Sequence, residues 1–116
     1  MRLELRRQGT ILLARCAGDL DVASAPAFRE RIDRQLHRYP QIIRLVINLE
    51  KVDFIDSSGL ASLLGRYKEM QRRRGQVFLV GLRPQAYRLC QLSGLCKLVH
   101  VADSESSALA RVEPRP

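Results

Sequence analysis

Short, nearly continuous apolar runs alternate along this chain with segments of helical periodicity. Residues 42–49 and 77–80 are apolar at almost every position, which is typical of strands covered on both faces. Residues 24–39 and 58–74 instead place their apolar side chains on one helical face. This alternation predicts a largely parallel sheet whose strands are joined by crossover helices.

The two ends of the chain extend the same pattern. Residues 2–8 and 10–17 flank Gly9 and predict an antiparallel hairpin. A short helix is expected before Gly94, followed by a strand over 98–101 and a final helix. The predicted fold is therefore α/β, with a mixed, mostly parallel sheet of about five strands in the order β-β-α-β-α-β-α-β-α.

Length and composition indicate one globular domain. The chain has 116 residues, with 46% hydrophobic and 28% charged, so we expect a domain over 1–112 and a frayed tail over 113–116. No apolar stretch approaches the ~20 residues of a membrane span, and the N-terminus lacks the apolar core of a signal peptide. We therefore expect no membrane partner. The three cysteines, Cys16, Cys90 and Cys96, lie in apolar surroundings and indicate the reduced, buried thiols of a cytoplasmic protein.

The net charge of +8 is the most unusual feature of the composition. Taken alone, this charge favours a nucleic-acid or anionic-membrane partner. However, the chain has no Trp, only 5% aromatic residues, and no helix-turn-helix or RNA-binding aromatic motif. We therefore expect no nucleic-acid partner.

Three loops are predicted to share one edge of the sheet, because the carboxyl ends of parallel strands meet there. They span 18–24, 50–58 and 81–84, and they bring acidic residues close to Ser57 and Ser58. The two serines have two compatible interpretations. They cap the second helix, or one of them displays a hydroxyl for phosphorylation at the start of that helix.

Catalysis is the weaker hypothesis for this edge. A serine nucleophile needs a base, but His37 and His100 fall elsewhere in the predicted layout. The sequence contains no G-x-S-x-G, no phosphate-binding glycine loop and no cysteine or histidine pair at metal-ligand spacing. We expect a protein that is not an enzyme and holds no cofactor or metal.

Four segments carry a family resemblance. Asp-Ser-Ser-Gly-Leu at 56–60 resembles the signature of the anti-sigma factor antagonists, which form part of the STAS domain family. Segments 18–21, 64–68 and 92–95 resemble the same family, and the sporulation branch in particular. The resemblance runs over about 3–112 in the same element order, and it implies a single STAS domain.

The resemblance also implies a function in partner switching. The unphosphorylated protein would bind an anti-sigma factor that is also a serine kinase, which frees the sigma factor. The kinase would then phosphorylate Ser57 and end the binding, and a phosphoserine phosphatase would reset the protein. ATP and Mg²⁺ would belong to the kinase.

The implied partner-binding residues each have a structural interpretation as well. Asp21 either braces its loop or faces the kinase, while Arg66 is a solvated charge on the outer face of its helix or an interface residue. Leu60 belongs to the core-facing stripe by periodicity, and Gly59 permits close packing. The full expected set is Asp21, Asp56, Ser57, Ser58, Gly59, Leu60 and Arg66.

Two other functions remain open within and outside the family. Relatives with the same Asp-Ser-Ser-Gly segment also act as STAS adaptors of stress-signalling complexes or of membrane transporters. Nucleic-acid binding is the remote alternative, supported by the basic run at 72–74.

Overall fold

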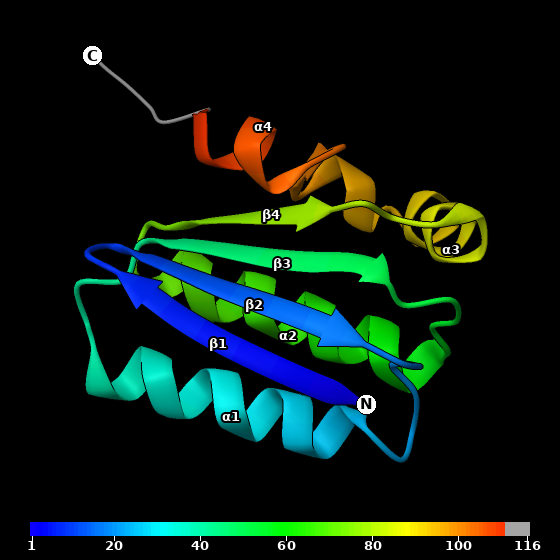
Figure 1. Cartoon of the computed structure of the whole chain (residues 1–116), viewed down its shortest axis with the longest axis horizontal. Coiled ribbons are helices and arrows are strands. Elements are labelled where there is room, and N and C mark those ends of the chain that lie inside the picture. Colours follow the sequence, from blue (N-terminus) through cyan, green and yellow to red (C-terminus); the bar gives the residue numbers. More distant parts are fainter. Residues whose placement is uncertain (111–116) are drawn as a thin grey trace.

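The computed structural model describes residues 1–110, which form a sheet with helices on both faces (Figure 1). The N-terminal hairpin and the alternating helices follow the predicted order, with one added 3₁₀ turn. The elements are β1 (Arg2–Gln8), β2 (Ile11–Ala17), α1 (Ala25–Arg38), β3 (Arg44–Lys51), α2 (Ser57–Arg72), β4 (Gln76–Val80), α3 (Pro84–Ser93), η1 (Leu95–Lys97), β5 (His100–Ala102) and α4 (Glu105–Ala110).

In the described residues the sheet has five strands in the order β1-β2-β3-β4-β5. The β1–β2 pair is antiparallel, whereas β2–β3, β3–β4 and β4–β5 are all parallel. This mixed, mostly parallel sheet confirms the predicted α/β fold. The carboxyl ends of β2, β3 and β4 consequently lie at one edge, at the right of Figure 1.

Alternate residues of the strands pack into two separate cores, as the period of two requires. Leu12 and Leu79 face the larger core, which they share with α1, α2 and α3. Leu13 and Phe78 face the smaller core, where Ala108 of α4 covers them. The central strands are therefore apolar on both faces, which explains their nearly continuous apolar sequence.

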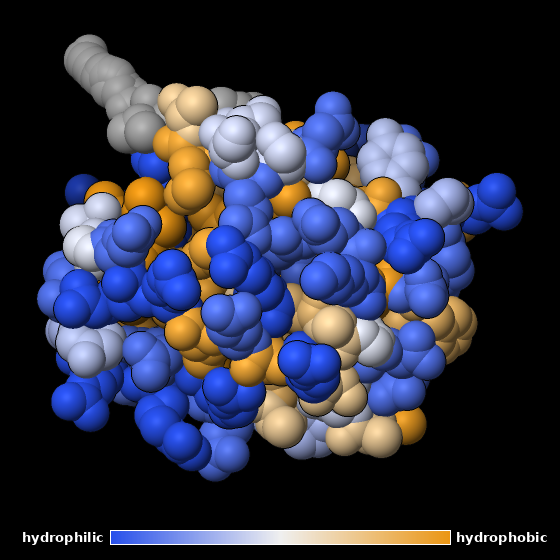
Figure 2. All heavy atoms as spheres, viewed as in Figure 1, coloured by the Kyte–Doolittle hydropathy of each residue, from blue (hydrophilic) through white to orange (hydrophobic). Residues whose placement is uncertain are grey.

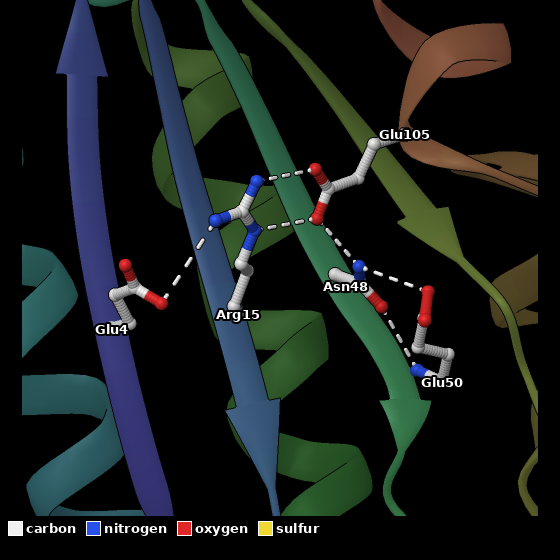
Figure 3. Close-up of polar contacts among 5 residues, drawn as sticks. All are labelled: Glu4, Arg15, Asn48, Glu50 and Glu105. Carbon is white, nitrogen blue, oxygen red and sulfur yellow. Dashed lines mark hydrogen bonds and ion pairs between the residues drawn. The ribbon is translucent and has the colours of Figure 1, made fainter.

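Helix α4 is fixed to the sheet through its first residue (Figure 3). The Glu105 carboxylate accepts two hydrogen bonds from the Arg15 guanidinium, at 2.8 Å each, and a third from Asn48 at 2.6 Å. The bonds from Arg15 lower the pKa of Glu105. Because Arg15 lies on β2 and Asn48 on β3, one carboxylate joins three elements.

Two strands begin two residues later than predicted. Strand β3 begins two residues late, because Ile43 and Arg44 both donate to the Thr10 carbonyl and the ladder starts only there. Strand β5 also begins late, at His100, because Gly94 adopts a left-handed conformation (φ 84°) and the 3₁₀ turn follows it. The expected tail, 113–116, lies outside the described residues.

Charge is unevenly distributed along the molecule. The three loops at the carboxyl edge of the sheet carry more acidic than basic side chains, with Asp19, Asp21, Glu50, Asp53 and Asp56 against Lys51 and Arg83. The opposite end, formed by the β1–β2 turn and the last turns of α1 and α2, carries exposed arginines, at Arg7, Arg38, Arg72 and Arg74.

Hydrophilic side chains dominate the face viewed in Figure 2. Within residues 1–110, no helix has the length and apolar character needed to cross a membrane.

Candidate functional site

Two loops at the carboxyl edge of the sheet are paired like short strands. Leu20, from the loop after β2, donates its N–H to the Phe54 carbonyl at 3.1 Å. The Leu20 carbonyl accepts from the Asp56 N–H at 3.3 Å, and Leu20 and Ile55 form an isolated parallel bridge. The loop that precedes α2 is therefore held by the loop that precedes α1.

The third loop is joined to the same site by side chains of α3 and its cap. The Gln85 amide donates to the Ile55 carbonyl at 2.8 Å and accepts from the Ile55 N–H at 2.9 Å. Arg83 forms an ion pair with Asp53 at 2.9 Å. The prediction that the three loops meet is thus confirmed. Sequence reasoning missed Gln85, because a glutamine that imitates a strand partner has no sequence signature.

Asp56 is the N-cap of α2. Its backbone is extended (φ −98°, ψ −173°), and its Oδ1 accepts the Gly59 N–H at 2.9 Å. Its Oδ2 accepts the N–H of Val22 at 3.0 Å, across the site. The interpretation of Ser57 or Ser58 as the cap is therefore wrong, because both residues lie inside the helix and Asp56, directly before them, occupies the cap position.

Ser57 is the first residue of α2 and its side chain is exposed. Within residues 1–110 its hydroxyl makes no hydrogen bond, whereas that of Ser62, one turn further on, is buried and donates to the Gly59 carbonyl. Ser58 is half-buried. Of the two adjacent serines, Ser57 is consequently the more accessible to a second protein.

Asp21 braces the loop before α1. Its Oδ1 accepts from the N–H groups of Ala23 and Ser24, both at 3.1 Å, and from the Ser24 hydroxyl at 3.2 Å. This arrangement satisfies backbone donors at the start of α1 that have no partner within the helix. The bracing interpretation of Asp21 is confirmed, whereas its contact with a partner stays a prediction.

Gly59 allows α2 to approach the neighbouring loop. A Cβ at this position would collide with the Leu20 carbonyl oxygen and would lie 2.9 Å from Cγ2 of Ile55. The expectation of close packing is confirmed. The start of α2, with Ser57, therefore sits directly against the loop that carries Asp21.

Comparison with known proteins identifies this arrangement. The STAS domain model matches residues 2–108. An anti-sigma F factor antagonist from Paenibacillus polymyxa is 32% identical over 113 residues, which cover 97% of this chain and 96% of the relative. The chain belongs to the STAS domain family of anti-sigma factor antagonists.

Other relatives share this STAS domain over most of their length. An anti-sigma-B factor antagonist from Listeria monocytogenes is 29% identical over 89 residues, covering 77% of this chain and 76% of the relative. The solved structure of the Bacillus cell fate determinant SpoIIAA in its phosphorylated form is 26% identical, with a TM-score of 0.78, and the match covers 97% of this chain and 100% of that one.

Arg66 of this STAS domain does not lie on an outer, solvated face, so that interpretation is wrong. The residue is only 7% exposed, because α1 packs beside α2 on the same face of the sheet. Its Nε lies 3.2 Å from Oδ1 of Asp33 on α1. Burial lowers the pKa of Arg66, and the charge of Asp33 opposes that shift. Contact of Arg66 with a partner stays a prediction, and burial weighs against it.

Exposed apolar side chains lie in the loops beside Ser57 and were not expected from the sequence. Val22 is 70% exposed and Phe54 is 45% exposed, and they precede α1 and α2 respectively. Leu60, the next candidate, is half-buried and packs against the larger core, as its periodicity predicts. Val22 and Phe54 are not unusual in being exposed, because Leu92 on α3 is 80% exposed, and single apolar side chains on a surface are common.

The site offers Ser57 no obvious base. His37 lies in the last turn of α1, at the far end of the sheet, and His100 stacks on Phe78 at 4.6 Å. Within residues 1–110, no group of three His, Cys, Asp or Glu side chains is arranged to hold a metal ion.

Proposed function

We propose that the unphosphorylated domain, expected over 1–112, binds an anti-sigma factor that is also a serine kinase and thereby frees a sigma factor. In this proposal the kinase phosphorylates Ser57, which ends the binding, and a phosphoserine phosphatase restores it. The observation that carries the proposal is the exposed, unbonded hydroxyl of Ser57 at the start of α2. The proposal is supported by the Bacillus relative SpoIIAA, whose structure has been solved in a phosphorylated form.

Charge supports release on phosphorylation. A phosphoserine carries about −1.5 to −2 charges at pH 7. Asp56 precedes Ser57 directly, and its carboxylate is hydrogen-bonded to the loop that holds Asp21. The phosphate would therefore add negative charge to an edge that is already acidic. A partner surface complementary to the unmodified edge would meet both repulsion and the bulk of the phosphate.

The fold should survive the modification. In the first turn of α2, the Gly59 N–H is bonded to the Asp56 carboxylate and the Leu60 N–H to the Asp56 carbonyl. The N–H groups of Ser57 and Ser58 point toward the helix start, where the helix dipole stabilises an anion by about 0.3–1 kcal/mol. The proposed switch consequently acts in the interface rather than by melting α2.

The proposed partner surface comprises side chains that differ in how they act. Asp21, Ser57 and Ser58 reach the surface and would touch the partner. Gly59 and Arg66 are buried and would act by placing α2. ATP and Mg²⁺ belong to the kinase, so this chain binds no cofactor and has no catalytic role. The exchange takes place in the cytoplasm, with no membrane or nucleic-acid partner.

The sporulation pathway is the first candidate, and the 32% identical anti-sigma F factor antagonist supports it. A sigma-B type pathway is the second candidate, and the Listeria relative supports that alternative. Binding measurements with the anti-sigma factors encoded beside this chain's gene would decide between them, because the cognate kinase should bind the unphosphorylated protein more tightly.

The decisive experiment is incubation of the chain with a candidate anti-sigma kinase, ATP and Mg²⁺, followed by mapping of the phosphate. We expect one phosphate on Ser57. Ser58→Ala is the matched control and should still be modified, whereas Ser57→Ala should not. A phosphate on any other residue would overturn the assignment of Ser57.

Binding provides the second test. Ser57→Asp adds a charge at the acceptor position, and Ser57→Asn adds a neutral group of the same shape. We expect the Asp variant to lose kinase binding by at least about tenfold, a free-energy change of about 1.4 kcal/mol, and the Asn variant to retain most of it. Equal affinity of the two variants would show that charge is not the cause of release.

A further inference from the structure

The segment directly before Ser57 is bonded on both sides, like the middle strand of a small sheet. On one side, the Phe54 carbonyl accepts the Leu20 N–H at 3.1 Å, and the Asp56 N–H donates to the Leu20 carbonyl at 3.3 Å. The intervening residue, Ile55, forms its backbone hydrogen bonds with a different partner. This alternation is that of a central β-strand, whose successive residues bond to opposite neighbours.

Within residues 1–110, no strand pairs with Ile55 on its second side. The pairing of β3 with β4 ends at Asn48 and Val80, and Gly81 follows with a positive φ of 70° as the chain leaves the sheet. The Gln85 carboxamide takes the place of a strand. Its Oε1 accepts the Ile55 N–H at 2.9 Å, and its Nε2 donates to the Ile55 carbonyl at 2.8 Å.

The other contacts of this segment do not duplicate those of Gln85. The Ile55 side chain is 2% exposed and belongs to the larger core, but this packing bonds neither of its backbone groups. The ion pair between Arg83 and Asp53 joins the same two loops. Both of its side chains are more than half exposed, so water and salt screen the attraction. The two hydrogen bonds of Gln85 are therefore the main link between α3 and the Ser57 loop.

We propose that Gln85 is a positioning residue for phosphorylation, an inference that rests on the proposed modification of Ser57. Phosphoryl transfer depends mainly on placing the attacking hydroxyl in line with the transferred phosphate. Gln85 holds residues 54–56 extended, so that Ser57, directly after them, is presented to the kinase in one place. The kinase consequently recognises the folded edge of the domain rather than a free peptide.

The effect should fall on recognition of the substrate rather than on the chemical step. Gln85→Met keeps the length of the side chain and removes both polar groups. Without the two hydrogen bonds, the loop occupies the competent position for only part of the time, and its apparent affinity for the kinase falls by that fraction. We expect the KM of this variant as a substrate to rise by at least about fivefold with kcat unchanged.

Gln91→Met is the matched control. Gln91 lies in the same helix, is exposed like Gln85, and donates from its carboxamide to the Tyr87 hydroxyl at 3.1 Å. This substitution costs α3 a side-chain hydrogen bond but leaves the contacts with Ile55 in place. We expect the KM of the control variant to equal that of the wild type.

Amide hydrogen exchange without the kinase tests the structural part of the proposal. The Ile55 N–H is the amide that Gln85 protects. In the Gln85→Met variant we expect it to exchange at least about tenfold faster, while the amides of β3 keep their wild-type rates because the domain stays folded. Unchanged exchange at Ile55 would show that Gln85 does not hold the loop and would overturn the proposal.

Kinetics with the candidate anti-sigma kinase, ATP and Mg²⁺ separate the two ways of failing. If wild-type Ser57 stays unmodified, the proposed function fails and the positioning role fails with it. If the wild type is phosphorylated and Gln85→Met has the same KM, only the positioning role is overturned. The same conclusion follows if Gln91→Met shows an equal rise in KM, or if Gln85→Met lowers kcat at an unchanged KM.

Discussion

Asp56→Ala removes one carboxylate that holds two parts of the candidate site together. Oδ1 caps α2 through the Gly59 N–H at 2.9 Å, and Oδ2 accepts from Val22 at 3.0 Å. Loss of an N-cap costs about 1 kcal/mol. Loss of the bond to Val22 costs about another 1 kcal/mol, which is less than the about 1.5–3 kcal/mol usual for a charged acceptor, because the exposed loop lets that N–H regain water. We expect the free energy of unfolding to fall by about 2 kcal/mol.

Urea unfolding followed by circular dichroism measures this change. The midpoint should fall with no change in the slope, since the folded surface is unaltered. In thermal unfolding, a domain of this size loses about 4 °C per kcal/mol, so the melting temperature should drop by about 8 °C.

Asp56→Ser is the matched variant. A serine retains an acceptor for the Gly59 N–H but is too short to reach Val22, so about half of the loss is expected. If the serine and alanine variants are equally unstable, the cap does not contribute as argued. If the alanine variant loses less than about 0.5 kcal/mol, the carboxylate is not a structural link between the loops.

Four further variants test other contacts. Gly59→Ala should displace α2 from the loop before α1 and destabilise the domain by at least about 2 kcal/mol, because backbone must move to admit the Cβ; urea unfolding checks this. Asp33→Ala leaves the buried guanidinium of Arg66 without its counter-charge and should cost about 1–3 kcal/mol, less than for a fully buried pair because Asp33 is partly exposed; the same assay should show a smaller loss for Arg66→Met. Glu105→Gln weakens the contact with Arg15, and the sign of its pH effect is fixed. The folded pKa of Glu105 is below its ordinary value of 4.5, so its contribution is complete above that pH and is lost as the pH falls through the folded pKa. A denaturation series should therefore show the variant less stable than wild type near neutral pH, and the difference should shrink in acid.

The arrangement of elements follows from sequence because periodicity reports burial directly. Runs such as 42–49 are apolar on both faces, since α1 and α2 cover one side of the sheet and α4 the other. The shared edge also follows, because parallel strands end together. The position of Ser57 at that edge could therefore be predicted from the sequence alone.

The features of the site that could not be predicted from the sequence depend on backbone angles and on neighbours that are distant in sequence. Three residues in a row, Asp56 to Ser58, are all good caps, and only the backbone angles select among them. The helical period places Arg66 on a given face of α2, but it does not reveal that α1 covers that face. Gln85 pairs with a loop thirty residues away, and no local pattern encodes such a pairing.

The separation of charge along the molecule has a consequence for how a partner approaches it. The molecule is 35 Å long, and its strands run along that axis (Figure 1). The acidic edge lies at one end of the strands and the exposed arginines at the other. At physiological ionic strength the Debye length is about 8 Å, so the two ends are several screening lengths apart. A docking protein therefore experiences the field of the nearer end rather than the net +8. In diffusional encounter the chain behaves as an oriented dipole, and a basic partner collides with its acidic end first. Lowering the salt should bring the arginines within range and slow that encounter.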